Sequence, residues 1–458
     1  MKKNYFPILL TFFSLASFGQ IVTIPDANFK NVLLNTICAD LVGNSAPTTD
    51  VDMNNDGEIQ VSEALLIRGL DVKNSSIASL DGIASFSNLR QLDCSNNNLQ
   101  SLDLNGVNGL RSLRCSNNFL TTLNLSNLSN LGSLNCGYNQ LSTLDINALN
   151  QLEFFTCNNN QLTSLNISNK PQLGSVLCPQ NQLTTLSLVN VPGLYELNCS
   201  DNLLTSLNVP SGNSFETFIC SRNLLTALDL TSGTNDFWWL DVSYNQLANF
   251  IVPRFSFDGR LNISGNLYTS LSFLPNSTII SFTIDDTNLV SLDLSNVLTT
   301  PQDIDPSEYF FKLNNNPNLQ SLNVKNGQQQ YFTSFYISNN PVLTSICADV
   351  IEVSSAADAF GSNATVVSDC TLGNQAVSSK QVTLTPNPTT GILNVHFETG
   401  FSINEINLYN PLGQLVKTLT ENEINTSSAI DVSALKTGTY FMEIVSDGSK
   451  TIKKFVKL

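Results

Sequence analysis

The middle of the chain repeats with a fixed period of 21 residues, which seven evenly spaced cysteines mark. The pattern around each cysteine is LxxLxCxxNxL, as in Leu89, Leu92, Cys94, Asn97 and Leu99. One repeat of this length cannot bury its own apolar residues, so successive repeats must stack into a solenoid with a continuous core. The seven cysteines are Cys94, Cys115, Cys136, Cys157, Cys178, Cys199 and Cys220.

The cysteine position continues along the chain as an apolar column. With a degenerate first repeat at Val72, the pattern predicts about twelve coils over residues 70–346. The later members of the column are Val242, Ile263 and Ile284, which are 21 residues apart from one another, and Leu313 and Ile337 after insertions.

Residues two apart on a short strand point the same way, so Leu92 and Cys94 are expected to face the core while Asp93 faces solvent. Stacked coils then form a parallel sheet along the concave side. The repeated asparagine, beginning at Asn97, is expected to form a buried ladder of amides. The repeat resembles the leucine-rich repeat family, in which the matching asparagine bonds the backbone where the strand turns away. Thr287 interrupts this column and predicts a local irregularity.

The seven column cysteines have three possible interpretations: disulfides, a metal–thiolate site, or small apolar core residues. Parallel in-register strands hold Cβ atoms about 4.8 Å apart, beyond the roughly 3.5–4.5 Å of a disulfide. No CxxC pair is present to hold zinc. Because Val242 and Ile263 fill the same column with hydrocarbon, we interpret the thiols as core residues.

Two further cysteines, Cys347 and Cys370, flank an irregular stretch after the last coil that resembles a C-terminal cap region. Disulfides are typical of exported proteins, and the N-terminal segment described next predicts export. We therefore expect residues 347–370 to form a cap that a Cys347–Cys370 disulfide closes, and Cys38 remains a free or undetermined thiol.

The first 19 residues are typical of a secretory signal peptide. Lys2 and Lys3 precede an apolar run from Tyr5 to Phe18,. This run is shorter than the roughly 20 residues that span a bilayer, and no other segment qualifies as a transmembrane span. We expect residues 1–19 to direct export, so that the mature chain is secreted or held at the outer cell surface.

The composition argues against several classes of function. The chain has 21 Lys and Arg against 37 Asp and Glu, a net charge of −16, so nucleic acid is not an expected partner,. His396 is the only histidine, which leaves little for a Ser-His-Asp triad or a multi-histidine metal site,. We therefore expect no enzymatic activity and assign no catalytic residue.

Residues 20–69 are expected to form an N-terminal cap. Phe29, Val32, Leu33 and Ile37 fall at helical spacing and predict a capping helix,. This helix precedes the segment DMNNDGEIQVSE, in which acidic and amide residues alternate before a glycine.

That segment fits the calcium-loop pattern D-x-[DN]-x-[DN]-G-x5-E and is similar in this respect to an EF-hand. Calcium takes oxygen ligands around a sharp turn, here at Gly57. The structural alternative is an Asx-rich turn that caps the next helix without metal. No second loop is present to pair with it, so calcium is expected to be structural. The expected ligands are Asp52, Asn54, Asp56, the Glu58 carbonyl and Glu63.

After a thin linker at 371–380 the period changes to short alternating strands separated by turn signals, which predicts an antiparallel β-sandwich over 381–458,. The motifs PNPTTG, LYNPLGQLV and LKTGTYFMEI…KFVKL resemble the C-terminal sorting domain of the bacterial type IX secretion system. The resemblance implies translocation by that machinery, removal of the domain, and attachment of the remainder to the cell surface or its release. The alternative is an ordinary accessory β-sandwich.

In a solenoid of this kind, binding is expected on the concave face. Exposed aromatic residues beside neutral polar ones suit a protein or glycan ligand. The alternative is scattered surface hydrophobes without a ligand. The outward positions that carry an apolar residue are Phe154, Leu177, Ile219 and Trp239.

Together these features predict a mostly β chain: a leucine-rich repeat solenoid with a parallel concave sheet, an N-terminal helical cap with an EF-hand-like loop, and a C-terminal antiparallel β-sandwich. The expected function is that of a cell-surface or secreted protein that binds a protein or glycan ligand, as an adhesin does. The alternative is a structural surface-layer component without a specific ligand, and a hydrolase ranks below both.

Overall fold

The computed structural model describes residues 19–43, 46–211, 213–231, 237–255, 259–274, 277–298, 310–327, 335–354, 364–368, 370, 382–397, 405–410, 414–420, 429–446 and 449–458. The chain divides into two compact units, Met1–Val366 and Val367–Leu458. The predicted signal peptide, apart from Gly19, and the predicted linker at 371–380 lie outside the described residues. Within the described ranges, no helix is both long and apolar enough to cross a membrane.

The first unit begins with the helix α1 (Ala27–Asn35). Asp26 caps it, because its side chain accepts hydrogen bonds from the backbone N–H groups of Asn28 and Phe29, both at 2.9 Å,. Phe29 and its helical neighbours point into the core. Ile37, expected on the same helical face, lies beyond the end of the helix and is exposed.

A second short helix and an antiparallel strand complete the cap. The helix α2 (Val61–Ala64) follows the predicted calcium loop. The strand β1 (Ala39–Asp40) pairs antiparallel with β2 (Gly69–Asp71), the first strand of the solenoid. This pairing covers one edge of the parallel sheet, which would otherwise present unpaired backbone groups.

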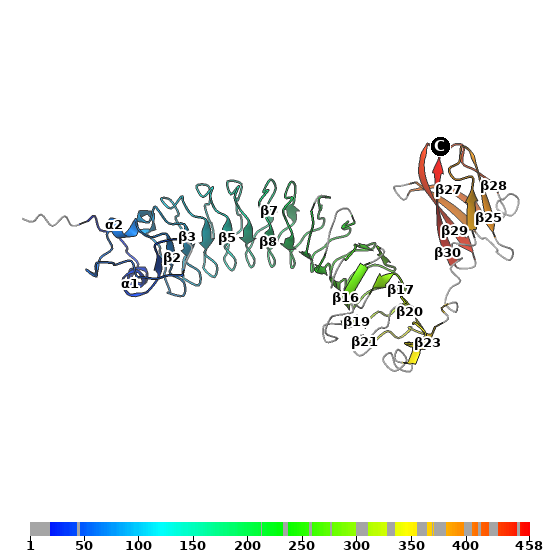
Figure 1. Ribbon diagram of the computed structural model, residues 1–458, viewed down its shortest axis with the longest axis horizontal. Helices are drawn as coiled ribbons and strands as arrows, with labels where there is room; N and C mark the ends of the chain where they lie inside the picture. Colours follow the sequence, from blue (N-terminus) through cyan, green and yellow to red (C-terminus); the bar gives the residue numbers. More distant parts are fainter. Residues whose placement is uncertain are drawn as a thin grey trace, which may run out of the picture. The chain divides into compact units, whose positions relative to one another are not determined.

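The solenoid contributes one short strand from each coil to a single sheet, whose strands lie side by side in Figure 1. The order is β1-β2-β3-β4-β5-β6-β8-β10-β11-β12-β14-β16-β19-β21, and all pairs after β1 are parallel. A 3₁₀ helix, η1 (Ile83–Ser85), lies between the first two coils. The remaining strands of the path are β3 (Gln91–Asp93), β4 (Ser112–Arg114), β5 (Ser133–Asn135), β6 (Phe154–Thr156), β8 (Ser175–Leu177), β10 (Glu196–Asn198), β11 (Thr217–Ile219), β12 (Trp239–Asp241), β14 (Gly259–Asn262), β16 (Ser277–Thr283), β19 (Phe310–Asn314) and β21 (Phe335–Ser338).

Some coils carry a second strand, and these strands form separate small sheets. One of them, β22 (Ser345–Cys347), pairs with β20 (Ser321–Asn323) in the register Asn323↔Cys347, so Cys347 belongs to a coil and does not follow the last one. The predicted boundary between solenoid and cap at 346/347 therefore falls inside a strand. The sheets are β7 (Ser164–Asn166) with β9 (Thr185–Ser187), β13 (Ile251–Val252) with β15 (Ser272–Phe273), and β17 (Ser291–Asp293), β20 (Ser321–Asn323), β22 and β23 (Thr365–Val367), while β18 (Val297–Leu298) pairs with β16.

The core of the solenoid follows the repeat column by column. Every column cysteine from Cys94 to Cys220 is buried and free, and Val242 and Ile263 continue the buried column. Parallel backbone hydrogen bonds join successive coils at this position, as from Cys94 N to the Arg114 carbonyl at 2.8 Å. The thiols are core residues, as the Val and Ile members of the column predicted.

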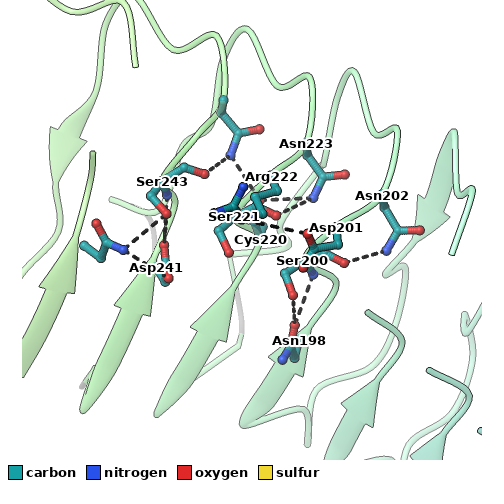
Figure 2. Close-up of polar contacts among 12 residues, drawn as sticks. Asn198, Ser200, Asp201, Asn202, Cys220, Ser221, Arg222, Asn223, Asp241 and Ser243 are labelled. Carbon is teal, nitrogen blue, oxygen red and sulfur yellow. Dashed lines mark hydrogen bonds and ion pairs between the residues drawn. The ribbon is translucent and has the colours of Figure 1, made fainter. Parts of the chain in front are cut away.

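The repeated asparagines join each coil to its neighbours from inside. The side-chain Nδ2 of Asn223 donates to the carbonyls of Cys199 and Cys220, at 3.0 and 3.1 Å, and its Oδ1 accepts from Leu204 N at 3.0 Å. Figure 2 shows Asn202 and Asn223 in the same place in adjacent coils. One amide therefore satisfies backbone groups of two coils, which explains the invariant spacing of this residue within the repeat.

The interruption of the asparagine column at Thr287 coincides with an irregular region. The Thr287 backbone N–H and Oγ1 both donate to Asn316 Oδ1, at 3.0 and 2.5 Å, across 29 residues of sequence. The strand pair that precedes Thr287, β14 with β16, is also irregular, because its register shifts at Gly259 and Arg260. A longer coil and a shorter polar side chain thus occur together at the position where the sequence predicted a local irregularity.

The residue two places after each column position adopts a left-handed backbone conformation. Asn occupies several of these positions and tolerates positive φ better than most residues. Arg222 and Tyr244 also adopt it, and the Arg222 guanidinium lies over the Tyr244 ring at 4.7 Å. The side chains of this rim therefore follow one another from coil to coil. The backbone φ angles of residues at this position include 54° at Asn96, 54° at Asn117, 54° at Tyr138, 52° at Asn159, 52° at Asp201, 54° at Arg222 and 53° at Tyr244.

The second unit contains two antiparallel sheets that share one core, which is the architecture of a β-sandwich,. Leu393 and Val395 from one sheet pack in the same buried cluster as Ile406 and Leu408 from the other. The sheets are β24 (Val382–Thr385), β25 (Ile392–Phe397) and β28 (Ala429–Asp431), and β27 (Leu415–Thr420), β26 (Glu405–Tyr409), β29 (Gly438–Ser446) and β30 (Ser449–Lys457).

Candidate ligand-binding face

The first residues of the main-sheet strands from β3 to β12 pair in register and form one row on the outward side of the sheet, and Arg260, the second residue of β14, continues it. Parallel neighbours lie about 4.8 Å apart, so this row is a regular array across the concave face. From β6 to β14 the row contains Phe154, Ser175, Glu196, Thr217, Trp239 and Arg260.

The structure places two of the four predicted ligand-binding residues in this row. Phe154 is 50% exposed and Trp239 is 43% exposed. Four strand steps of about 4.8 Å separate them by about 19 Å. Leu177 lies in the neighbouring row, is only partly exposed, and is the third residue of β8. The aromatic residues thus mark two ends of a face and do not form one patch.

The fourth residue, Ile219, was expected in contact with solvent and is instead only 8% exposed. Asn198 and Asp241 lie in register on the strands to either side of it. Flanking side chains about 4.8 Å away shield a β-branched residue between them. Ile219 is therefore not available to a ligand.

Sequence reasoning missed a second row at the edge of the same face, one position before each strand. Tyr195 is 38% exposed and Trp238 is 54% exposed, and Glu153 and Glu216 in the same row are also exposed. Their spacing was visible in the sequence, because each directly precedes an outward residue. Alternation alone assigns this position to the inner side of the strand, so the sequence pattern does not predict the row.

Local contacts fix several side chains of the two rows. The Arg260 guanidinium lies over the Trp238 ring at 5.5 Å, and Ser175 Oγ donates to Glu196 Oε2 at 2.5 Å. A Cβ atom at Gly174 would lie only 2.6 Å from Cε1 of Tyr195, so the ring lies against the bare backbone of this glycine,. The face is therefore partly organised before any ligand arrives.

A hollow of about 220 Å³ lies where the cap meets the first coils, lined in part by Asp40 and Pro47. Its charges are paired: Lys73 Nζ lies 2.7 Å from Asp71 and Arg114 lies 3.9 Å from Asp93. These pairs are partly exposed to solvent, where such ion pairs contribute little stability. The hollow thus contains paired charges of both signs, unlike the aromatic rows farther along the sheet.

The predicted calcium loop turns tightly around Asp52. Its Oδ1 accepts from Asp56 N at 3.1 Å and its Oδ2 from Gly57 N at 2.9 Å, and Gly57 has a φ of +82°. The buried Glu63 carboxylate accepts from Asn54 N at 3.2 Å and from Gln60 N at 2.9 Å. The first and last predicted ligands therefore both point at the loop backbone.

Gln60 fills the interior of this loop. Its Nε2 donates to Asp56 Oδ2 at 2.8 Å and its Oε1 accepts from Asn54 Nδ2 at 2.9 Å. Lys30 pairs with the Glu58 side chain at 2.7 Å, while the Glu58 carbonyl accepts a long contact of 3.5 Å from Gln60. Within the described part of the chain, no group of three or more His, Cys, Asp or Glu side chains is arranged to hold a metal ion. The oxygen donors fit calcium chemically, provided that the Gln60 side chain moves out.

The remaining predicted site residues are cysteines. Cys347 and Cys370 are disulfide-bonded, whereas the other eight cysteines are free. Cys38 is buried in the cap, and burial raises its pKa to about 12, so this thiol stays protonated at neutral pH,. His396 lies on β25 of the second unit.

Comparison with known proteins finds one family model, the secretion system C-terminal sorting domain, which matches residues 383–458. No curated protein sequence matches the chain significantly.

Solved structures with a similar arrangement include three bacterial proteins. The functional domain of InlJ from Listeria monocytogenes, described as including a cysteine ladder, is 20% identical over 96% of this chain and 98% of that one, with a TM-score of 0.48. YopM from Yersinia pestis, a leucine-rich effector protein, is 25% identical over 57% and 67%, with a TM-score of 0.39. The internalin InlF from Listeria monocytogenes is 15% identical over 77% and 94%, with a TM-score of 0.40. Residues 383–458 are therefore a sorting domain of the type IX secretion system, and a leucine-rich repeat solenoid with a cysteine column precedes them in this chain.

Proposed function

We propose that the solenoid binds a protein or glycan ligand through its concave face, as an adhesin does. The sorting domain implies export, followed by secretion or attachment to the cell surface. The observation that carries the proposal is the in-register row in which Phe154 and Trp239 expose about half of their surface. Large aromatic side chains on a rigid, open face are typical anchors of an interface.

The alternative function is that of a structural surface-layer component without a specific ligand. Under this alternative the exposed rings are scattered surface residues, as all soluble proteins carry. The two functions differ in what they predict for single side chains, because only a specific ligand depends on a particular ring.

An array of glycans and of host and matrix proteins, probed with the purified chain, tests the proposal. Phe154→Ala and Trp239→Ala are expected to weaken binding of any array ligand about tenfold or more while thermal melting stays unchanged. Phe119→Ala is the matched control, since Phe119 is also 50% exposed but lies outside the strands of the sheet. An array without ligands, or binding that survives both substitutions, would favour the structural alternative.

We further propose that the chain has no enzymatic activity. Its single histidine, His396, lies in the sorting domain, away in sequence from the solenoid. Catalysis requires convergent acid, base or nucleophilic groups in a pocket. Turnover of any compound in a panel of hydrolase substrates, abolished by a single carboxylate substitution, would contradict this.

We also propose that residues 52–63 hold a calcium ion that rigidifies the cap. Asp52, Asp56 and Glu63 would supply carboxylate oxygens, and Asn54 and the Glu58 carbonyl would supply neutral ones. Bound calcium would contribute positive charge that offsets the carboxylates of Asp52, Asp56 and Glu63. Loop and cap would then be fixed to each other, because Glu63 belongs to α2.

A further inference from the structure

We propose that the ligand of the concave face is a basic, extended segment of a partner protein. The inference rests on the proposed binding function and names the partner that suits the surface. The surface consists of the row at the strand starts and the edge row before it, from β6 to β12, and is called here the acidic-aromatic stripe. Its glutamates are Glu153, Glu196 and Glu216, and its aromatic residues are Phe154, Tyr195, Trp238 and Trp239.

Acidic and aromatic residues interleave along this stripe. Glu196 lies two strand steps from Phe154 on one side and two from Trp239 on the other, about 10 Å each way,. In the edge row, Glu216 lies between Tyr195 and Trp238, one coil from each. Every aromatic residue of the stripe thus has a carboxylate on an adjacent coil or within two strand steps.

The charge of the stripe has a single sign. None of the ten residues in the two rows from Glu153 to Trp239 is Lys or Arg, and all ten are described. Arg222 lies on the opposite rim, where it contacts Asp201 at 3.9 Å and the Tyr244 ring. Among the described residues, none of the three glutamates forms an ion pair. On a chain of net charge −16 they favour a cationic ligand and repel an acidic one,.

The aromatic rings suit cations as well. A guanidinium or ammonium group binds the face of Trp most strongly among the aromatic side chains. Arg260 already demonstrates this at one end of the stripe, where its guanidinium lies over the Trp238 ring. Lys and Arg side chains of a partner can therefore contact a ring and a carboxylate at the same time.

The dimensions indicate an extended segment. About 19 Å separate Phe154 from Trp239, and an extended chain rises about 3.3 Å per residue, so about six residues cross the stripe. Alternate side chains of such a segment recur about every 6.6 Å on one side, which brings several of them over the interleaved rings and carboxylates. A neutral glycan would use the rings and leave the three glutamates without a counter-charge.

A labelled heptapeptide of alternating lysine and serine, and its counterpart with glutamate in place of lysine, test the inference by fluorescence anisotropy at about 150 mM salt, where long-range charge effects are screened. The full chain should bind the lysine peptide and not the glutamate peptide. The triple variant Glu153→Gln, Glu196→Gln, Glu216→Gln should weaken binding at least tenfold, and Trp239→Ala about fivefold.

The matched control removes the same charge elsewhere: Asp81→Asn, Asp103→Asn, Asp145→Asn. Asn already occupies the place of Asp103 and Asp145 in other coils, at Asn124 and Asn166, so these changes are structurally neutral. The control should bind the lysine peptide within about twofold of the parent chain. Equal weakening by both triple variants would mean that net charge alone attracts the peptide, which overturns the inference.

The array described above separates the two proposals. An acidic protein or a glycan that depends on Trp239 would overturn the basic segment and leave the proposed binding function intact. A basic protein that loses affinity in the glutamate variant supports both. An array without any Trp239-dependent ligand, together with a lysine peptide that ignores the stripe, overturns both.

Discussion

The coils that carry the cysteines and the coils that follow them fill their cores with different residues. From Cys94 to Cys220 every coil supplies the same thiol and the same asparagine at the same spacing. Beyond them the column holds Val, Ile and Leu, and aromatic pairs pack in the core, as where Phe237 and Phe255 lie 5.7 Å apart. A small, uniform core residue keeps coils interchangeable, whereas larger and varied residues accompany insertions and a register shift,.

The largest expected difference between the two regions is the loss of folding stability at alkaline pH. Burial raises the pKa of Cys136 and of Cys178 to about 12, from an ordinary value of 9.0. Between these values the unfolded chain loses thiol protons that the folded chain keeps, so stability falls as pH rises above 9. At pH 10 the loss is about 1 kcal/mol per buried thiol, and several kcal/mol over the column. Urea unfolding at pH 8 and pH 10 measures it.

The double variant Cys157→Val, Cys178→Val serves as the control, because it gives two regular coils the residue type of the later ones. It should lose less stability at pH 10 than the parent chain. An unchanged loss would show that other groups cause the effect.

Thiol titration of the denatured, unreduced chain should yield eight thiols.

Removing one rung of the asparagine ladder should have the next largest effect. Asn160 accepts from Leu141 N at 2.9 Å and donates to the carbonyls of Cys136 and Cys157 at 3.0 and 3.1 Å. Asn160→Ala leaves several buried backbone groups unsatisfied and should cost about 3 kcal/mol of unfolding free energy. Thr287→Val in the irregular region should cost less, about 1 kcal/mol, since fewer bonds depend on that side chain. Equal losses in urea unfolding would contradict the contrast between regions.

Calcium should have the smallest effect and should act only at the cap before the regular coils. With 1 mM calcium in place of a chelator, thermal melting should shift upward by about 2 °C. Asp52→Asn with Glu63→Gln should abolish the shift, and Asp81→Asn, an exposed acid outside the loop, should leave it unchanged. Identical melting of the parent chain under both conditions would contradict a calcium site.

The sequence was most informative where one residue type recurs at one spacing. The column thiols, the asparagine ladder and the break at Thr287 follow from the period, because each coil meets an almost identical neighbour. Burial of Ile219 did not follow, since it depends on the two residues that happen to flank it on neighbouring strands. Nor did the insertion of Gln60 into the calcium-like loop, because a ligand pattern does not specify which amide fills the loop.

In the row at the strand starts, the number of coils between two side chains sets the distance between them. Phe154 and Trp239 are separated by whole coils, so duplicating one coil between them would lengthen their separation by a single step of about 4.8 Å. Each ladder would simply gain one more member, with its bonding partners already in place above and below. The separation of the two rings can therefore change only in steps of about 4.8 Å, one for each coil added or removed.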